Sequence, residues 1–312
     1  MEWQTKVTVQ PLPERFSYAT RFFFAGSCFA IDIAQKMRDL HFLVSPDAFG
    51  TLFNPASIAS SLERLEVPLF FEQAEVMHFP YGAYGSLNHH TSFSGEDADS
   101  FLAHANAQLK KASDFFLTAD VVVITFGTAW TYTYQGKVVA NCHKMPARFF
   151  NRDFLSPEKT AELMTPLLQR HHNKTWIMTV SPIRHWGDGA HGNQLSKASL
   201  LLAIERLQDS FPNVRYFPSY ELVMDELRDY RYYAADMCHL GEETIRYILE
   251  RFLEAAADEE TRDLVKKMEK LNASLAHKPL FPKSEQNFIF SKKLEKQRAE
   301  LLQTIGNKRK LC

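Results

Sequence analysis

Three residues have the side chains that nucleophilic acyl transfer requires: Ser27, Asp236 and His239. Ser27 and Gly26 follow the apolar residues 22–25 and precede a helical pattern, so we expect Ser27 at a tight strand-to-helix turn. A serine hydroxyl is a weak nucleophile until a base removes its proton, and the base needs a carboxylate to fix its tautomer. His239 and Asp236 are suited to these two roles from a single loop.

Each of these motifs is weak when taken alone. A Gly-Ser pair after a strand is usually a turn in which the serine caps a helix, and an Asp and a His three residues apart usually belong to a surface turn. Their order along the chain is more specific, because Ser27 follows the first expected strand and Asp236 and His239 precede the last helix of the core.

The elements that must position these residues are visible in the hydrophobic pattern. Short apolar runs predict buried parallel strands at residues 21–25, 121–126, 176–180 and 214–217. Helical stretches lie between them, including residues 30–40 and one that starts at Ser156, with Pro157 in the favoured first helical position. Alternating strands and helices predict the α/β class with a mainly parallel sheet.

The last part of the chain has a different character. Residues 241–255 place apolar side chains on one helical face and should close a core domain that spans residues 1–255. Residues 256–312 are interpreted as a charged helical appendage, with helical stretches at 258–275 and 291–305. Residues 283–312 contain eight Lys or Arg and three Glu, a net charge of +5. We favour a solvated helical tail, with an anionic partner as the alternative.

Composition limits the classes of function. The 312 residues are 45% hydrophobic and have a net charge of −1, which argues against nucleic acid or an anionic membrane as partner. The first ten residues lack the apolar stretch of a secretory signal, and no segment has about 18 uninterrupted apolar residues. We therefore expect a cytoplasmic location. The four cysteines are scattered and form no CxxC pair, so we expect reduced thiols and no disulfide framework. We also expect no cofactor. The oligomeric state stays open.

Gly26, Ser27, Cys28, Phe29 and Ala30 form the motif after which the GSCFA family is named, and the chain resembles that family over about residues 20–255. Further motifs follow in the family order at Asn54-Pro55, His89-His90, residues 127–130, 141–144, 181–185, 193–197, 217–221 and 229–231. The resemblance implies a three-layer α/β/α sandwich of the SGNH-hydrolase or flavodoxin-like type. It also implies Ser27 as nucleophile, Asp236 as acid and His239 as base.

The chain departs from the SGNH pattern at the oxyanion hole, the set of donors that stabilises the negative oxygen of the transition state. SGNH enzymes usually have Gly-x-Asn-Asp after the strand that corresponds to residues 121–126, and this chain has Ala129 in place of the asparagine. Loss of one such donor costs about 100-fold to 1,000-fold in rate. The N–H groups of Ser27 and Gly50 are two expected donors, although a simple turn explains Gly50 equally well. We expect Asn141 as the third donor, because residues 132–139 should form a hairpin-like excursion that returns the chain to the site. Thr128 is the alternative donor.

Four further residues are candidates for substrate binding: His143, Arg184, His185 and Lys197. Buried salt bridges are the competing explanation for Arg184 and Lys197. Imidazole and carboxylate groups also bind zinc, but the spacing of His89, His90, His143, His185 and Asp188 matches no metal signature, and we expect no metal.

The sequence therefore predicts a serine esterase that hydrolyses a small acyl ester, such as an acetyl group on a carbohydrate. A non-catalytic protein that binds a ligand in the same pocket is the alternative, because Ala129 replaces the oxyanion asparagine. Cysteine chemistry through Cys28 or Cys238 is a third and weaker interpretation, since neither thiol has a base of its own.

Overall fold

The computed structural model describes residues 4–310, and a five-stranded parallel sheet forms its centre. Along the sheet the strands have the order β10-β9-β5-β1-β2. Numbered by their sequence order within this sheet, they run 2-1-3-4-5, which is the flavodoxin-like order. The predicted fold class is confirmed. The strands are β1 (Arg21–Gly26), β2 (Leu43–Val44), β5 (Val121–Phe126), β9 (Thr175–Val180) and β10 (Val214–Tyr216).

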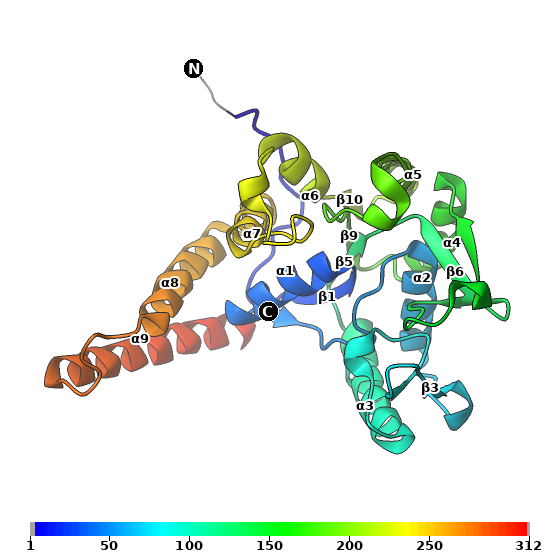
Figure 1. The fold of residues 1–312 in the computed structure, drawn as a ribbon. Helices are drawn as coiled ribbons and strands as arrows, with labels where there is room; N and C mark the ends of the chain where they lie inside the picture. Colours follow the sequence, from blue (N-terminus) through cyan, green and yellow to red (C-terminus); the bar gives the residue numbers. More distant parts are fainter. Residues whose placement is uncertain (1–3, 311–312) are drawn as a thin grey trace.

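Helices cover both faces of the sheet and make three layers (Figure 1). Alternate residues of each strand face opposite layers: Phe22 and Val121 pack with α1 and α7, whereas Phe23 and Val122 pack with the helices of the other face. All six residues of β5 are buried, which explains its continuous apolar run. The covering helices are α1 (Cys28–Asp39) and α7 (Glu242–Ala256) on one face, and α2 (Pro55–Glu66), α3 (Ala98–Leu117), α4 (Pro157–Arg170) and α5 (Gly189–Ser210) on the other.

A small antiparallel sheet with the strand order β7-β6-β8 follows directly after β5. It contains β6 (Trp130–Tyr134), β7 (Lys137–Val139) and β8 (Phe150–Phe154). Gln135 and Gly136 join the first two strands, and both have positive φ angles, as a tight hairpin turn requires. The expected hairpin-like excursion is thereby confirmed. A two-stranded ribbon, β3 (Met77–His78) with β4 (Tyr84–Gly85), and the short helix α6 (Ser219–Glu221) complete the smaller elements.

A helical hairpin of α8 (Glu259–Ala276) and α9 (Glu285–Lys310) ends the described chain. The bounds of α8 agree with the predicted helical stretch 258–275 to within one residue, whereas α9 begins six residues before its predicted start at residue 291. At the base of the hairpin, Met268 and Ile305 belong to the same apolar cluster as α1 and α7. The far end, with the α8–α9 connection, projects away from the sheet and its covering helices (Figure 1).

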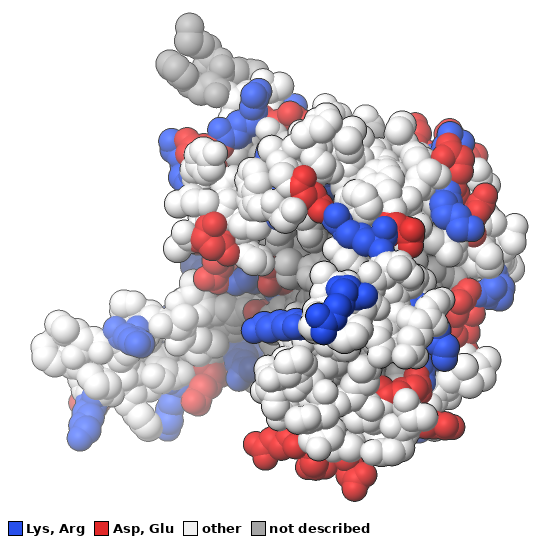
Figure 2. All heavy atoms as spheres, turned by 45° about the vertical axis from the view of Figure 1, so that its right-hand side comes forward, with Lys and Arg blue, Asp and Glu red and all other residues white. Residues whose placement is uncertain are grey.

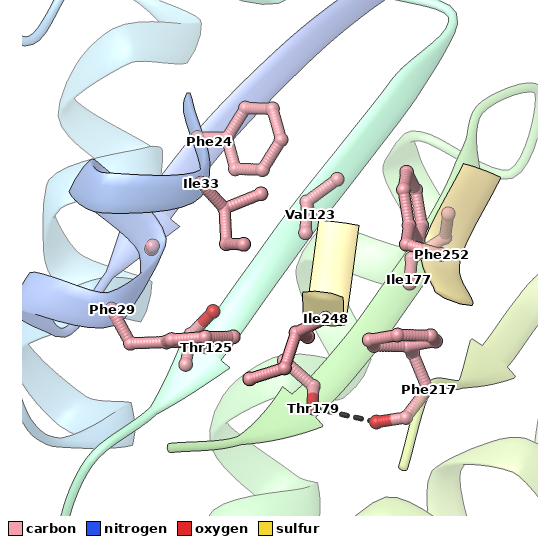
Figure 3. Close-up of a pocket in the computed structure, with 11 residues that line it drawn as sticks. Phe24, Phe29, Ile33, Val123, Thr125, Ile177, Thr179, Phe217, Ile248 and Phe252 are labelled. Carbon is pink, nitrogen blue, oxygen red and sulfur yellow. Dashed lines mark hydrogen bonds between the residues drawn. The ribbon is translucent and has the colours of Figure 1, made fainter. Parts of the chain in front are cut away.

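A small apolar cavity of about 20 Å³ lies between the sheet and the layer of α1 and α7 (Figure 3). Its walls include Phe24, Ile33 and Phe252, and the Thr179 hydroxyl at its edge is committed to the carbonyl of Phe217 at 2.6 Å. A space of this size holds about one water molecule. It offers no group for catalysis, so the functional site must lie elsewhere.

Among residues 4–310, no helix is both long enough and apolar enough to cross a bilayer. Three of the four cysteines, Cys28, Cys142 and Cys238, are free thiols. Cys312 and residues 1–3 lie outside the described part of the chain, so the expectations that involve them are not addressed by the structure.

Candidate active site

Ser27 lies where β1 ends and α1 begins, at the carboxyl edge of the sheet. Its backbone occupies the N-cap position of α1, but its side chain makes no capping hydrogen bond. The residue is only 1% exposed, and Oγ is buried without a hydrogen-bond partner in the described chain. Buried polar groups are nearly always paired, so this hydroxyl does not cap the helix and is left for a partner that the described chain does not supply.

Gly26 makes this turn possible. Its φ angle is +138°, and a Cβ at this position would lie 2.2 Å from the carbonyl oxygen of Thr125 on β5. Only glycine allows the two strands to approach so closely while the chain turns into the helix. The Ser27 N–H then donates to the same Thr125 oxygen at 3.1 Å, which fixes the residue on the edge of the sheet.

Asp236 and His239 come from a tight loop before α7. The Asp236 carboxylate accepts hydrogen bonds from the N–H groups of Cys238 and His239, at 3.0 and 2.9 Å, and from Nδ1 of the His239 ring at 2.6 Å. These bonds, above all the one from the ring, lower the pKa of Asp236 to about 2. The carboxylate is therefore charged at neutral pH and directs Nε2 of His239 away from itself.

Ser27 and His239 line one cleft of about 750 Å³. Within the described residues they form no hydrogen bond with each other, although catalytic hydrogen bonds are often long before substrate binds. The cleft lies beside the ends of β1 and β5, the switch point at which open α/β sheets usually bind ligands. Its walls come from the segments 27–28, 51–54, 128–132, 140–142, 181–188 and 238–239, with His90 and Arg152.

The backbone N–H groups expected in the oxyanion hole are already bonded. The Ser27 N–H donates to Thr125, and the Gly50 N–H donates to the Asp47 carboxylate at 2.8 Å. The Thr128 N–H donates to Phe53 O at 2.9 Å. The geometry therefore does not support these three N–H groups as free donors. Gly50 is also absent from the cleft wall, which Thr51 lines instead.

The Thr128 hydroxyl is committed as well. It lies 3.1 Å from the Ser196 hydroxyl and accepts a hydrogen bond from the Trp130 N–H at 3.2 Å. Ala129, which occupies the position of the usual asparagine, is fully buried in the apolar core and does not line the cleft. Residue 129 therefore offers no side-chain donor to the cleft.

Two asparagine side chains line the cleft, Asn54 and Asn141, and in each only one end of the amide has a hydrogen-bond partner in the described chain. Oδ1 of Asn54 caps α2 by accepting from the Ser57 N–H at 2.8 Å, and Oδ1 of Asn141 accepts from the His143 N–H at 2.8 Å. Each bond fixes the oxygen, so the NH₂ group is the end left for a ligand. Sequence reasoning missed Asn54 because an asparagine before a proline is fully explained as a helix cap, a role that uses only the oxygen.

Two of the four predicted substrate-binding residues, Arg184 and His185, line the cleft. Among residues 4–310, Arg184 has no carboxylate partner: its guanidinium lies over the Trp186 ring at 5.5 Å and contacts the Met224 sulfur at 3.4 Å. Burial, assisted by the positive charge of Lys197, lowers the pKa of His185 to about 4. The cleft therefore offers an unpaired cation beside a neutral imidazole at pH 7.

The other two predicted substrate-binding residues do not reach the cleft. Lys197 is 1% exposed, and its ammonium donates to the carbonyls of Gly127 and Ser181 at 2.6 and 2.7 Å. His143 is also 1% exposed and bonds to Tyr81 and to backbone carbonyls. Both predictions need correction. Lys197 binds the carbonyls that follow β5 and β9, and His143 holds the loop that carries Asn141.

A model of the GSCFA family matches residues 21–252. The chain belongs to the GSCFA family. No curated protein matches the chain. The family match contains Ser27, Asp236, His239 and every residue of the cleft wall, and it ends within α7, so α8 and α9 lie outside it. GSCFA membership suggests a hydrolase-like function.

In this GSCFA protein, the thiols beside the site are poorly suited to nucleophilic attack. Burial, with a smaller contribution from the charge of Asp32, raises the pKa of Cys28 to about 11. Burial and the charge of Asp236 also raise the pKa of Cys238. Since the thiolate is the reactive form of cysteine, both groups are protonated at neutral pH and weakly reactive.

The histidines of this GSCFA chain do not converge. Within residues 4–310, no group of three or more His, Cys, Asp or Glu side chains is placed to hold a metal ion. His89 is buried among the rings of Phe49, Phe71 and Phe93, and burial lowers its pKa to about 3. Asp188 instead forms an ion pair with Arg152 at the edge of the cleft.

Proposed function

We propose that this GSCFA protein is a serine hydrolase that removes small acyl groups, with Ser27, His239 and Asp236 as its catalytic residues. The observation that carries the proposal is the buried, unpaired Ser27 hydroxyl on a cleft that it shares with His239. The 2.6 Å hydrogen bond that Nδ1 of His239 donates to the Asp236 carboxylate supports it further. The free thiols fit a reducing compartment, and we keep the cytoplasm as the proposed location.

In the proposed reaction, Nε2 of His239 takes the proton of Ser27 while Oγ attacks the acyl carbonyl carbon. Asp236 stabilises the imidazolium that forms. His239 then gives the proton to the departing alcohol, and an acyl-enzyme remains. A water molecule, activated by the same imidazole, hydrolyses the acyl-enzyme and restores Ser27.

Two donors remain for the oxyanion after the bonded N–H groups are excluded. The first is the Cys28 N–H, which lies at the positive end of α1 and has no carbonyl acceptor in the described chain. The second donor is the amide NH₂ of Asn54 or of Asn141. An amide restores the chemistry that Ala129 lacks.

A fluorophosphonate probe tests the proposal directly, because only an activated serine reacts with it. We expect labelling of the purified protein at Ser27, identified by peptide mass spectrometry, and none in Ser27→Ala. His239→Ala should label far more slowly. Cys28→Ala is the matched control and should label like the natural protein, since the neighbouring thiol has no role in the mechanism. An unlabelled Ser27 would refute the hydrolase.

The cleft also suggests the class of ester. Trp130 and Tyr132 line it, Trp186 is 52% exposed at its wall, and the buried Nε1 of Trp130 has no hydrogen-bond partner in the described chain. Aromatic faces with a few polar groups suit a sugar ring, so an acetylated carbohydrate is the proposed substrate. Trp186→Ala should raise KM for acetylated saccharides and leave KM for a simple aryl acetate unchanged.

A non-catalytic binding protein is the second candidate. The bonded N–H groups of Ser27, Gly50 and Thr128 favour it, because they leave the oxyanion site with few free donors. In that case saccharides should bind to the cleft, as shown by calorimetry, while Ser27 stays unlabelled and short acyl esters are not hydrolysed.

A further inference from the structure

The connection between α8 and α9 carries exposed apolar side chains that no described residue covers. Leu280 is 86% exposed and Phe281 70%, and at the start of α9 Phe288, Ile289 and Phe290 are 58%, 60% and 46% exposed. Single exposed apolar residues are ordinary, but five within eleven positions of one projecting end are not. We call residues 277–296 the hairpin tip.

Lysines surround these apolar side chains. The hairpin tip contains five lysines, all exposed, and two glutamates, which gives it a net charge of +3 although the whole chain has a net charge of −1. Within residues 4–310, only Lys296 has a carboxylate near it, Glu300 at 3.9 Å, and Lys292 lies over the Phe288 ring at 4.5 Å. The five are Lys278, Lys283, Lys292, Lys293 and Lys296.

The position of the tip matters as much as its composition. It is the far end of an arm that extends from the body of the molecule, so a flat surface reaches it without a clash (Figure 1). Figure 2 shows this arm with much uncharged surface between separate blue side chains and a little red, whereas blue and red are interspersed over the body. The family match ends at residue 252, so the tip lies outside the matched region.

We propose that the hairpin tip docks the protein on an anionic lipid bilayer. The five apolar side chains enter the boundary between headgroups and acyl chains, and the lysines remain at the level of the negative headgroups. Neither attraction is strong alone, and peripheral anchoring generally needs two such signals together. The near-neutral charge of the chain led us to expect no membrane partner, and the tip is the local exception.

Charge favours a lipid surface over a second copy of this chain. Two tips in contact would bring their lysines together, and that repulsion opposes association. An anionic bilayer instead attracts every lysine of the tip. This inference does not depend on the proposed hydrolase activity, and Ser27→Ala should bind membranes like the natural protein.

The test is co-sedimentation of the full chain with two kinds of vesicle, phosphatidylcholine alone and phosphatidylcholine mixed with phosphatidylglycerol. We expect binding to the mixed vesicles, weaker binding to the neutral ones, and loss of binding at high salt, which screens the lysines. Phe281→Ser/Ile289→Ser should lower the partition coefficient at least about tenfold, and Lys292→Ser/Lys293→Ser about tenfold with less salt dependence.

Leu69→Ser/Phe70→Ser is the matched control. These side chains are 64% and 51% exposed after α2, near Glu66 and Glu72 rather than lysines, so their loss should leave membrane binding unchanged. All these side chains are exposed, and circular dichroism should show that the variants fold.

Absence of vesicle binding, equal binding to both vesicles, or full binding by Phe281→Ser/Ile289→Ser would overturn the proposal. If the natural protein does not bind vesicles but forms a dimer in sedimentation velocity, and Phe281→Ser/Ile289→Ser is a monomer, then the occupant of the tip is a second copy of the chain.

Discussion

The Ser27 hydroxyl shows how one side chain departs from its ordinary role. A serine before a helix normally accepts a hydrogen bond from the first turn, and loss of that bond costs about 1 kcal/mol. Here the whole residue is only 1% exposed, and Oγ makes no such bond. A buried hydroxyl without a partner costs about 1–3 kcal/mol, and substrate or His239 would supply the missing partner in the proposed reaction.

The Asn54 amide gives the first prediction. Asn54→Ser keeps an oxygen that can cap α2 but removes the NH₂ group, so kcat for a short acyl ester should fall by about 100-fold or more while stability changes little. Asn141→Ala tests the competing donor in the same assay. An unchanged kcat in Asn54→Ser together with a large loss in Asn141→Ala would assign the oxyanion to Asn141 instead.

Lys197 gives the second prediction. Burial lowers its pKa to about 7, so the folded protein binds this proton less tightly than the unfolded chain does. Between about pH 7 and pH 10 the unfolded state holds more protons, and the free energy of unfolding should therefore gain on the order of 1 kcal/mol per pH unit from this group. Urea unfolding at several pH values should show that Lys197→Met lacks this gain.

The control for Lys197 is Lys159→Met. The Lys159 side chain is 58% exposed on α4, and among residues 4–310 it pairs only with Glu162. The free energy of unfolding of Lys159→Met should change with pH in parallel with that of the natural protein. A parallel profile in Lys197→Met as well would show that the buried ammonium does not titrate in this range.

At the scale of elements, Glu226 joins three segments that are remote in the sequence. Its carboxylate accepts from the Val7 N–H at 2.8 Å and from Arg251 of α7 at 2.8 and 2.9 Å, and Tyr247 donates to it as well. Burial alone would raise the pKa of Glu226, but these hydrogen bonds and the charge of Arg251 outweigh it and hold the pKa below its usual value. The network fixes α7, which follows the loop of His239.

Glu226→Gln gives the third prediction. The change leaves Arg251 without its main partner, and removal of one member of a buried ion pair costs about 3–5 kcal/mol of unfolding free energy. Because the pKa of Glu226 is lowered, the stabilisation is present at neutral pH and fades as the pH falls below the usual glutamate value of 4.5. Chemical unfolding at pH 7 and below pH 4 should show the difference shrinking.

Glu254→Gln is the matched control, since Glu254 also pairs with Arg251, at 3.4 Å, but is 55% exposed. It should cost no more than about 1 kcal/mol. Equal losses of unfolding free energy in Glu226→Gln and Glu254→Gln would show that the buried network stabilises the protein no more than the exposed ion pair does.

At the scale of the whole molecule, the sheet and the helical hairpin share one apolar cluster. Met268 of α8 and Ile305 of α9 pack in the cluster that also holds Phe22 of β1 and Ile248 of α7. The base of the hairpin is therefore a continuation of the layer that covers the sheet, while its tip projects from the molecule.

Met268→Ala gives the fourth prediction. Met268 is fully buried, and its truncation should cost about 2–5 kcal/mol. Because the cluster is continuous, helical circular dichroism and tryptophan fluorescence should shift to lower temperature together. All tryptophans precede residue 187, so the fluorescence reports on the body rather than on the hairpin.

Leu275→Ala, in the same helix but at a position 43% exposed, is the control and should have a much smaller effect. A fluorescence transition that stays in place while part of the helical signal melts early in Met268→Ala would contradict a shared core. The hairpin would then be an independently folding unit.

The sequence alone determined the layers and the turn that carries Ser27. Residues 121–126 form a strand within the predicted bounds because helices cover both sides, and burial on both sides requires the continuous apolar run that the sequence shows. Gly26 before Ser27 likewise predicted a turn that only glycine fits. The charge of residues 283–312 was also visible, but its concentration around exposed apolar residues at a projecting tip was not.

Only the tertiary structure decided which polar groups are free. The Thr128 N–H is bonded because the carbonyl of Phe53 arrives from a different loop, and Lys197 is buried because the ends of β5 and β9 present Gly127 and Ser181 to it. A residue type states which hydrogen bonds a group is able to make, whereas its partners and its exposure depend on segments far away in the sequence. For this reason Asn54, which looks like a simple helix cap in the sequence, faces the cleft in the folded protein.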